Sequence, residues 1–194
     1  NDYFEIFTGI DYAVTSTVKL ESVRLFAEKV APSRTVFSAL SSRTTAHATN
    51  LRQDSLSPLV WDHNVSDSGF THSDSSNAHQ ITLDSAGKYL VYINLPLQQS
   101  GSVQRATLDL HVKVAGSLIA GGVASQGYIR LANSGSSLHW VGMVSTSSSN
   151  QVLTTEVVKS DNQGDTSIIV PANTKASIFI EKLSNANKLF SATA

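Results

Sequence analysis

One strand with two apolar faces limits what this chain can fold into. Residues 81–97, ITLDSAGKYLVYINLPL, are typical of two strands joined by a turn at residues 84–87. Because side chains alternate along a strand, Leu90 and Tyr92 share one face of the second strand. The opposite face is also apolar and consists of Tyr89, Val91, Ile93 and Leu95. A surface strand needs only one apolar face, so the second face must be covered by another part of the protein or by another chain.

The pattern of short apolar segments and turns predicts an all-β fold from residue 37 to residue 183. About nine such segments follow one another, separated by Ser, Gly, Asn and Asp. Residues 106–114 alternate cleanly, and residues 58–62, PLVWD, form a shorter apolar segment. Trp61 and Trp140 lie inside apolar segments, so we expect both in the core. The series predicts an antiparallel β-sandwich or jelly roll.

The two ends of the chain differ from this pattern. Residues 1–36 lack the Ser-rich turns and are interpreted as an N-terminal arm or docking segment. Val23, Phe26 and Val30 fit a helix, whereas the alternation of Val18 with Leu20 fits a strand, so both structures stay open. Residues 184–194 show no pattern and are interpreted as a C-terminal tail.

Composition removes several classes of function. The net charge is −1 and charged residues make up 15% of the chain, which predicts neither nucleic-acid binding nor binding to an anionic membrane. No apolar run reaches the roughly 20 residues of a membrane-spanning helix. The chain has no cysteine, which excludes disulfides, a thiol nucleophile and thiolate metal ligands.

The sequence contains no constellation typical of catalysis, and we expect no enzyme, no cofactor and no small-molecule substrate. No G-x-S-x-G turn or phosphate-binding glycine loop occurs, and Glu156 and Asp161 lie near turns. The polar segment 62–79 offers side chains that could bind a metal, but their spacing matches no compact ligand motif. These side chains are Asp62, His63, Asp67, His72, Asp74 and His79. We therefore expect no metal site.

A second two-faced strand strengthens the case for assembly. In SIFIEKL, residues 177–183, Ile178 and Ile180 share one face, and Phe179 and Leu183 share the other. Large exposed apolar patches rarely persist on a monomer, so the excess faces predict a homo-oligomer. The alternative is that residues 1–36 cover the second face within one chain.

The order of these segments resembles the TNF/C1q-like jelly-roll family. The resemblance lies in PLVWD, FTHS, HQITLDSAGKYLVYINLPL, RATLDLHVKVAGSLIAGG, GYIRLANSGSSLHWVGMVS and ASIFIEKL. It implies a homotrimer, with Leu90 and Tyr92 at the threefold axis beside Phe179 or Ile178 of the last strand. The GYIR and IEKL motifs are more similar to the versions in phage structural proteins. Residues 1–36 have no counterpart in the family.

The resemblance implies a virion structural protein, located on the capsid surface. We expect a homotrimeric capsid decoration, or cement, protein that binds the major capsid protein lattice and stabilises a phage head. Its docking residues are expected in the N-terminal arm, at Tyr3, Phe4, Ile6 and Phe7. The alternative is the receptor-binding tip of a tail fibre or a trimeric surface adhesin. In that alternative, the segments 62–79 and 145–151 bind the receptor.

Overall fold

The computed structural model describes residues 34–41, 51, 55–99, 105–130, 134–161, 167–171 and 174–184. This part of the chain contains strands and no helix. The strands are β1 Val36–Ser41, β2 Ser57–Pro58, β3 His63–Asp67, β4 Phe70–Thr71, β5 Gln80–Leu83 and β6 Gly87–Gln99. They continue with β7 Ala106–Val114, β8 Ser117–Ile129, β9 Gly135–Thr146, β10 Gln151–Lys159, β11 Ile168–Ile169 and β12 Ala176–Lys182.

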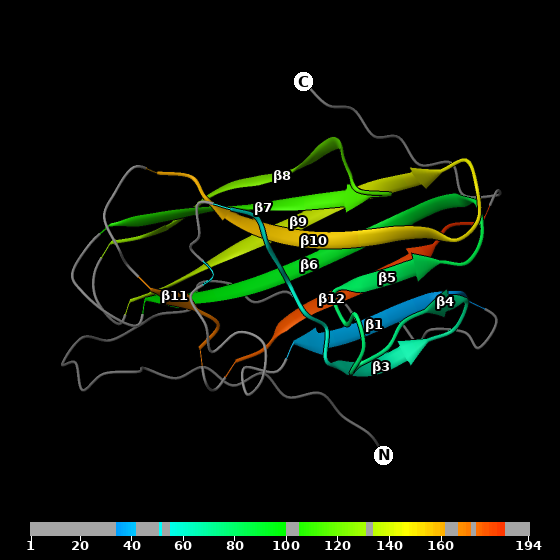
Figure 1. Ribbon diagram of the computed structural model, residues 1–194, viewed down its shortest axis with the longest axis horizontal. Coiled ribbons are helices and arrows are strands. Elements are labelled where there is room, and N and C mark those ends of the chain that lie inside the picture. The colour runs from blue at the N-terminus through cyan, green and yellow to red at the C-terminus, as the bar shows by residue number, and fades with distance from the viewer. Residues whose placement is uncertain are drawn as a thin grey trace, which may run out of the picture. The chain divides into compact units, whose positions relative to one another are not determined.

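The strands form two antiparallel sheets that lie in two layers (Figure 1). In sheet A the order is β9–β6–β12–β1–β3, and β11 pairs with β6 next to β12. In sheet B the order is β4–β5–β10–β7–β8, and β2 pairs with β10. The first and last strands, β1 and β12, are neighbours in sheet A. The predicted all-β sandwich of antiparallel strands is confirmed.

The core lies between the sheets and is built from the inward row of each strand. Tyr89, Val91, Ile93 and Leu95, the longer apolar row of β6, are all buried there. Sheet B contributes the inward rows of β7 and β10, which include Leu108, Leu110, Leu153 and Val157. Trp61 and Trp140 are buried as predicted. Burying a side chain of this size stabilises the fold by about 1.5–3 kcal/mol.

Two segments differ from the sequence prediction in their secondary structure. Of the apolar segment 58–62, only Pro58 belongs to a strand, because Leu59 and Trp61 each form a single backbone hydrogen bond, to Thr155 and Ala78. The predicted loop 62–79 instead contains β3 and β4. β3 is an edge strand with exposed residues, so it does not need the apolar alternation that identifies a half-buried strand.

β8 is one long strand whose pairing with β7 is interrupted twice. Its pairing with β7 shifts register between Leu108 and Leu110 and again between His111 and Lys113. Gly121, at φ 68°, lies in the second interruption and accepts a 2.8 Å hydrogen bond from the indole of Trp140 on β9. β8 therefore lies against β9, and the indole links the edges of the two sheets.

The candidate assembly face

The outward face of sheet A carries a cluster of large apolar side chains. In the pairing of β6 with its neighbours, Tyr92 is opposite Phe179 on one side and Val141 on the other. The rings of Tyr92 and Phe179 are 6.1 Å apart, and Leu90 is opposite Met143. Tyr92 is 43% exposed and Val141 is 60% exposed. These five residues, Leu90, Tyr92, Val141, Met143 and Phe179, are called the sheet A face below.

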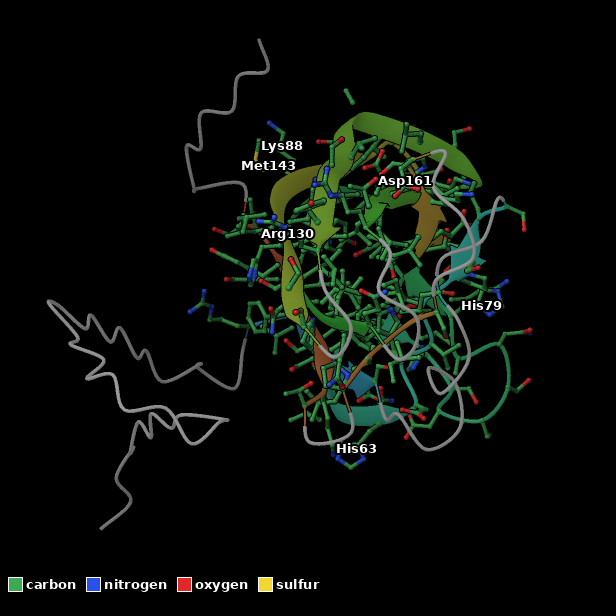
Figure 2. The ribbon with its side chains drawn as sticks, turned by 90° about the vertical axis from the view of Figure 1, so that its left-hand side faces the viewer. His63, His79, Lys88, Arg130, Met143 and Asp161 are labelled. Carbon is green, nitrogen blue, oxygen red and sulfur yellow. The ribbon has the colours of Figure 1, made fainter. Side chains whose placement is uncertain are left out.

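Charged side chains occur only at one margin of this surface, among the outward residues of β6, β9 and β12. Lys88 precedes Leu90 on β6, and it projects from the same side of the molecule as Met143 (Figure 2). Glu181 is opposite Leu90 on β12, but it is nearly buried and pairs with Arg34, whose Nε donates a 2.7 Å hydrogen bond. The centre of the face therefore presents no charge to solvent.

A hollow of about 300 Å³ opens on this surface beside the aromatic pair. One part of its lining is apolar and includes Tyr92, Val141 and Phe179. The other part is polar and includes Asn94, His139 and Ser177, which lie in one row across β9, β6 and β12. The Nε2 atom of His139 lies 2.8 Å from the hydroxyl of Ser137. Such a hollow can accept a side chain that is apolar along its length and polar at its tip.

The structure separates the sequence-predicted interface residues into two groups. Leu90, Tyr92 and Phe179 lie on the outward face of sheet A. Ile178 is 1% exposed and packs in the core, because the alternation of β12 points Ile178 and Ile180 inward. The prediction for Ile178 is therefore corrected: its side chain belongs to the sandwich core.

Val141 and Met143 were missed by the sequence analysis, although the signal was present. In LHWVGMVS, residues 138–145, the inward row is Leu138, Trp140 and Val144. The residues between them are then outward, and two of these are apolar. The predicted docking residues Tyr3, Phe4, Ile6 and Phe7 lie outside the described residues.

The polar segment 62–79 holds no cluster for a metal. Among the residues that the structure describes, no group of three or more His, Asp or Glu side chains could hold a metal ion. His63 and His79 lie far from one another in Figure 2. His72 has a fully buried ring whose nitrogens lie 2.8 Å from the Gln80 carbonyl oxygen and 2.7 Å from the Trp61 carbonyl oxygen. It also contacts the edge of Phe37, so its role is to tie the segment to the core.

No helix within the described residues is long and apolar enough to cross a membrane.

No family model matches the chain, and no curated protein matches it. Among solved structures, it is similar to Eiger TNF from S. frugiperda, with a TM-score of 0.52 and 14% identity over 82% of this chain and 99% of that one. The chain has the TNF/C1q-like jelly-roll fold.

Two further structures with this jelly roll are similar at slightly lower scores. The globular domain of a zebrafish complement 1qA protein has a TM-score of 0.48 and 12% identity, over 78% of this chain and 98% of that one. The PRD1 vertex protein P5 has a TM-score of 0.49 and 16% identity, over 77% of this chain and 96% of that one. At such identities the likeness concerns the fold.

Proposed function

We propose that this chain is a virion structural protein, a homotrimeric capsid decoration or cement protein that binds the major capsid protein lattice and stabilises a phage head. The observation that carries the proposal is the sheet A face. It joins aromatic and aliphatic side chains of three neighbouring strands, of which Tyr92 and Val141 are exposed and the others half-buried, and its centre is uncharged. A surface of this kind supports self-association rather than catalysis.

The energetic argument for assembly rests on the exposed side chains. Complete burial of an apolar side chain the size of Tyr92, Val141 or Phe179 is worth about 1.5–3 kcal/mol. Association costs several kcal/mol in lost translational and rotational freedom, so the burial of one such residue cannot drive it. A cluster of five residues, repeated in three copies, can offset this cost. The Tyr92–Phe179 pair supplies the aromatic anchors that dominate interface energies.

The junction before β1 supports attachment through the N-terminal segment. The Lys182 amide donates a 2.9 Å hydrogen bond to the Thr35 carbonyl, and Arg34 pairs with Glu181 on the same strand. Any force on residues 1–33 would therefore be transmitted to β12, inside sheet A. This anchoring suits a segment that holds the jelly roll on a capsid, with Tyr3, Phe4, Ile6 and Phe7 as its apolar contacts.

A truncation tests this division of roles. Removal of residues 1–31 takes away neither partner of the Arg34–Glu181 pair and none of the strands that the structure describes. We expect the truncated protein to remain a trimer in light scattering, with a mass three times that of its chain. In a co-sedimentation assay with undecorated phage heads, it should fail to bind while the full chain binds. Binding by the truncated protein would refute the docking role of the segment, and a single-chain mass for the full protein would refute the trimer.

A receptor-binding tip or trimeric surface adhesin is the second candidate. It is supported by the β9–β10 connection, residues 147–150, in which every residue is exposed, polar and uncharged. Replacement of Ser147, Ser148 and Ser149 by Gly should abolish adsorption to host cells if the tip function is correct. A decoration protein should tolerate the same change, with unchanged thermal stability of the decorated head.

A further inference from the structure

The polar part of the hollow on the sheet A face contains one titratable side chain. His139 lies on the outward row of β9, two residues before Val141, and it lines the hollow. Across the sheet it is followed by Asn94 of β6 and then by Ser177 of β12. His139 and Asn94 are exposed in the single chain, and Ser177 is half-buried. Water therefore solvates the imidazole in either protonation state before assembly.

Neutral groups surround this imidazole in the described part of the chain. Its Nε2 atom lies 2.8 Å from the hydroxyl of Ser137 on the same strand. Asn94 and Ser177 are neutral as well, and β8, which lies against β9, has no charged residue from 117 to 129. None of these groups carries the negative charge that would compensate an imidazolium.

The charged groups around the hollow are positive or distant. Lys175 is two residues before Ser177, and Arg130 directly follows β8. Lys88 lies at the far end of the face on β6, and all three of these charged side chains are positive. On the outward rows of β6, β9 and β12 the carboxylate is Glu181, which is four residues along β12 from Ser177, roughly 13 Å away, and already forms an ion pair. A second proton on the imidazole would therefore have no negative partner.

Assembly through the sheet A face removes water from this site. Tyr92, Val141 and Phe179 of the face line the hollow together with the imidazole, so a chain that covers these three also closes the hollow. Burial disfavours the charged form of an imidazole, and positive neighbours act in the same direction. The free chain can therefore solvate an imidazolium at this position, whereas the assembled chain cannot.

We propose that His139 makes the assembly sensitive to pH: the trimer is stable near neutral pH and dissociates when the imidazole takes up a second proton. This inference rests on the proposed trimer and assigns its regulation to one residue. The direction follows from linkage, because the free chain binds more protons than the assembled chain, so that a falling pH favours the free chain. A histidine in water takes up this proton near pH 6.5, so the change is expected between about pH 7 and about pH 5.

Light scattering of the full chain at about pH 7.5 and about pH 5.5 measures the response. One unit below pH 6.5, the imidazole of the free chain is about 90% protonated. Exclusion of that proton from the assembly weakens the binding of each chain about tenfold. We therefore expect the dissociation constant of the trimer to rise by up to about 1,000-fold, since three chains each contribute this factor.

Glutamine variants identify the residue responsible. His139→Gln keeps a neutral polar side chain in the hollow and cannot take up the proton, so its dissociation constant should change less than about threefold between the two pH values. The matched control is His111→Gln, on the outward row of β7 opposite Glu156 and away from the sheet A face. The control should dissociate in acid as the unsubstituted chain does. Circular dichroism at both pH values should show the same β content in all three proteins.

A permanent charge gives a second measurement. His139→Lys carries, already at neutral pH, the charge that acid gives to the unsubstituted chain. We expect this variant to be folded but mainly monomeric at both pH values. A trimeric His139→Lys protein would contradict the inference, because a charge in the hollow would then be compatible with assembly.

The outcomes separate this inference from the proposed function. If the unsubstituted chain is monomeric at the higher pH, the proposed trimer is wrong, and this inference with it. If the unsubstituted chain is equally trimeric at both pH values, only the pH response is wrong. Dissociation of His139→Gln in acid to the same extent as the unsubstituted chain would refute the role of His139.

Discussion

The outward row of β7 in sheet B and the outward rows of sheet A present opposite kinds of surface, although the two sheets share one core. The outward row of β7 is Thr107, Asp109, His111 and Lys113, and Lys113 forms a 2.6 Å ion pair with Glu156 of β10. The corresponding rows of sheet A carry Leu90, Tyr92, Val141, Met143 and Phe179. Since both sheets bury their inward rows equally well, the difference cannot come from folding. The proposed assembly accounts for the difference, because the charged row of β7 suits water and the sheet A face suits a cover of another chain.

The cost of covering the two faces explains why they are not interchangeable. Burying the charged groups of sheet B would cost several kcal/mol per ion unless a partner compensated each of them. Covering sheet A removes apolar surface from water, which is favourable. The only unfavourable contribution is the desolvation of the polar groups in the hollow. The sheet A face therefore has the lower free-energy cost of burial, and its exposure to water is also the less favourable of the two.

The largest expected effect comes from the same substitution on each face. Val141→Lys places a charge in the centre of the sheet A face, and Val158→Lys places one on the outward row of β10, opposite Asp109. We expect Val141→Lys to weaken assembly by about 2–4 kcal/mol per interface, because a buried, unpaired ammonium is left. Val158→Lys should change the free energy of assembly by less than about 0.5 kcal/mol. Sedimentation equilibrium measures both, and equal effects would remove the distinction between the faces.

The strand that joins the two surfaces provides the second test. A Cβ atom at Gly142 would lie 2.4 Å from the Trp140 ring, whose indole holds the bulge of β8. Gly142→Ala should therefore displace the indole and destabilise the fold by about 1–3 kcal/mol, as overpacking does. Gly135→Ala on the same strand is the control, because its Cβ would approach the Leu97 carbonyl oxygen no closer than 3.4 Å. Chemical denaturation should give Gly142→Ala a lower midpoint than Gly135→Ala. Equal midpoints would show that the Trp140 ring can move aside without cost.

The sequence could predict the parts of this fold that depend on local alternation. The inward row of β6, the buried tryptophans and the outward position of Tyr92 all follow from a period of two. The shared face of Leu118, Val123 and Tyr128 on β8 does not, because residues spaced five apart point to one side only through bulges that depend on the pairing with β7. β3 was not predicted for another reason. It is an edge strand with a polar sequence, and its strand structure depends on backbone pairing with β1.

The smallest expected effects compare one ion pair from each surface. Glu181 is nearly buried beside the sheet A face and pairs with Arg34, while Glu156 lies on the solvent side of sheet B and pairs with Lys113. Glu181→Gln should lower the free energy of unfolding by about 1–2 kcal/mol, because the guanidinium of Arg34 loses a charge-assisted hydrogen bond in a site with little water. Glu156→Gln should cost less than about 1 kcal/mol, and the loss should shrink further in high salt. Urea denaturation at low and high salt measures both. If Glu156→Gln were the more damaging change, the outward face of sheet B would not be the one that faces water.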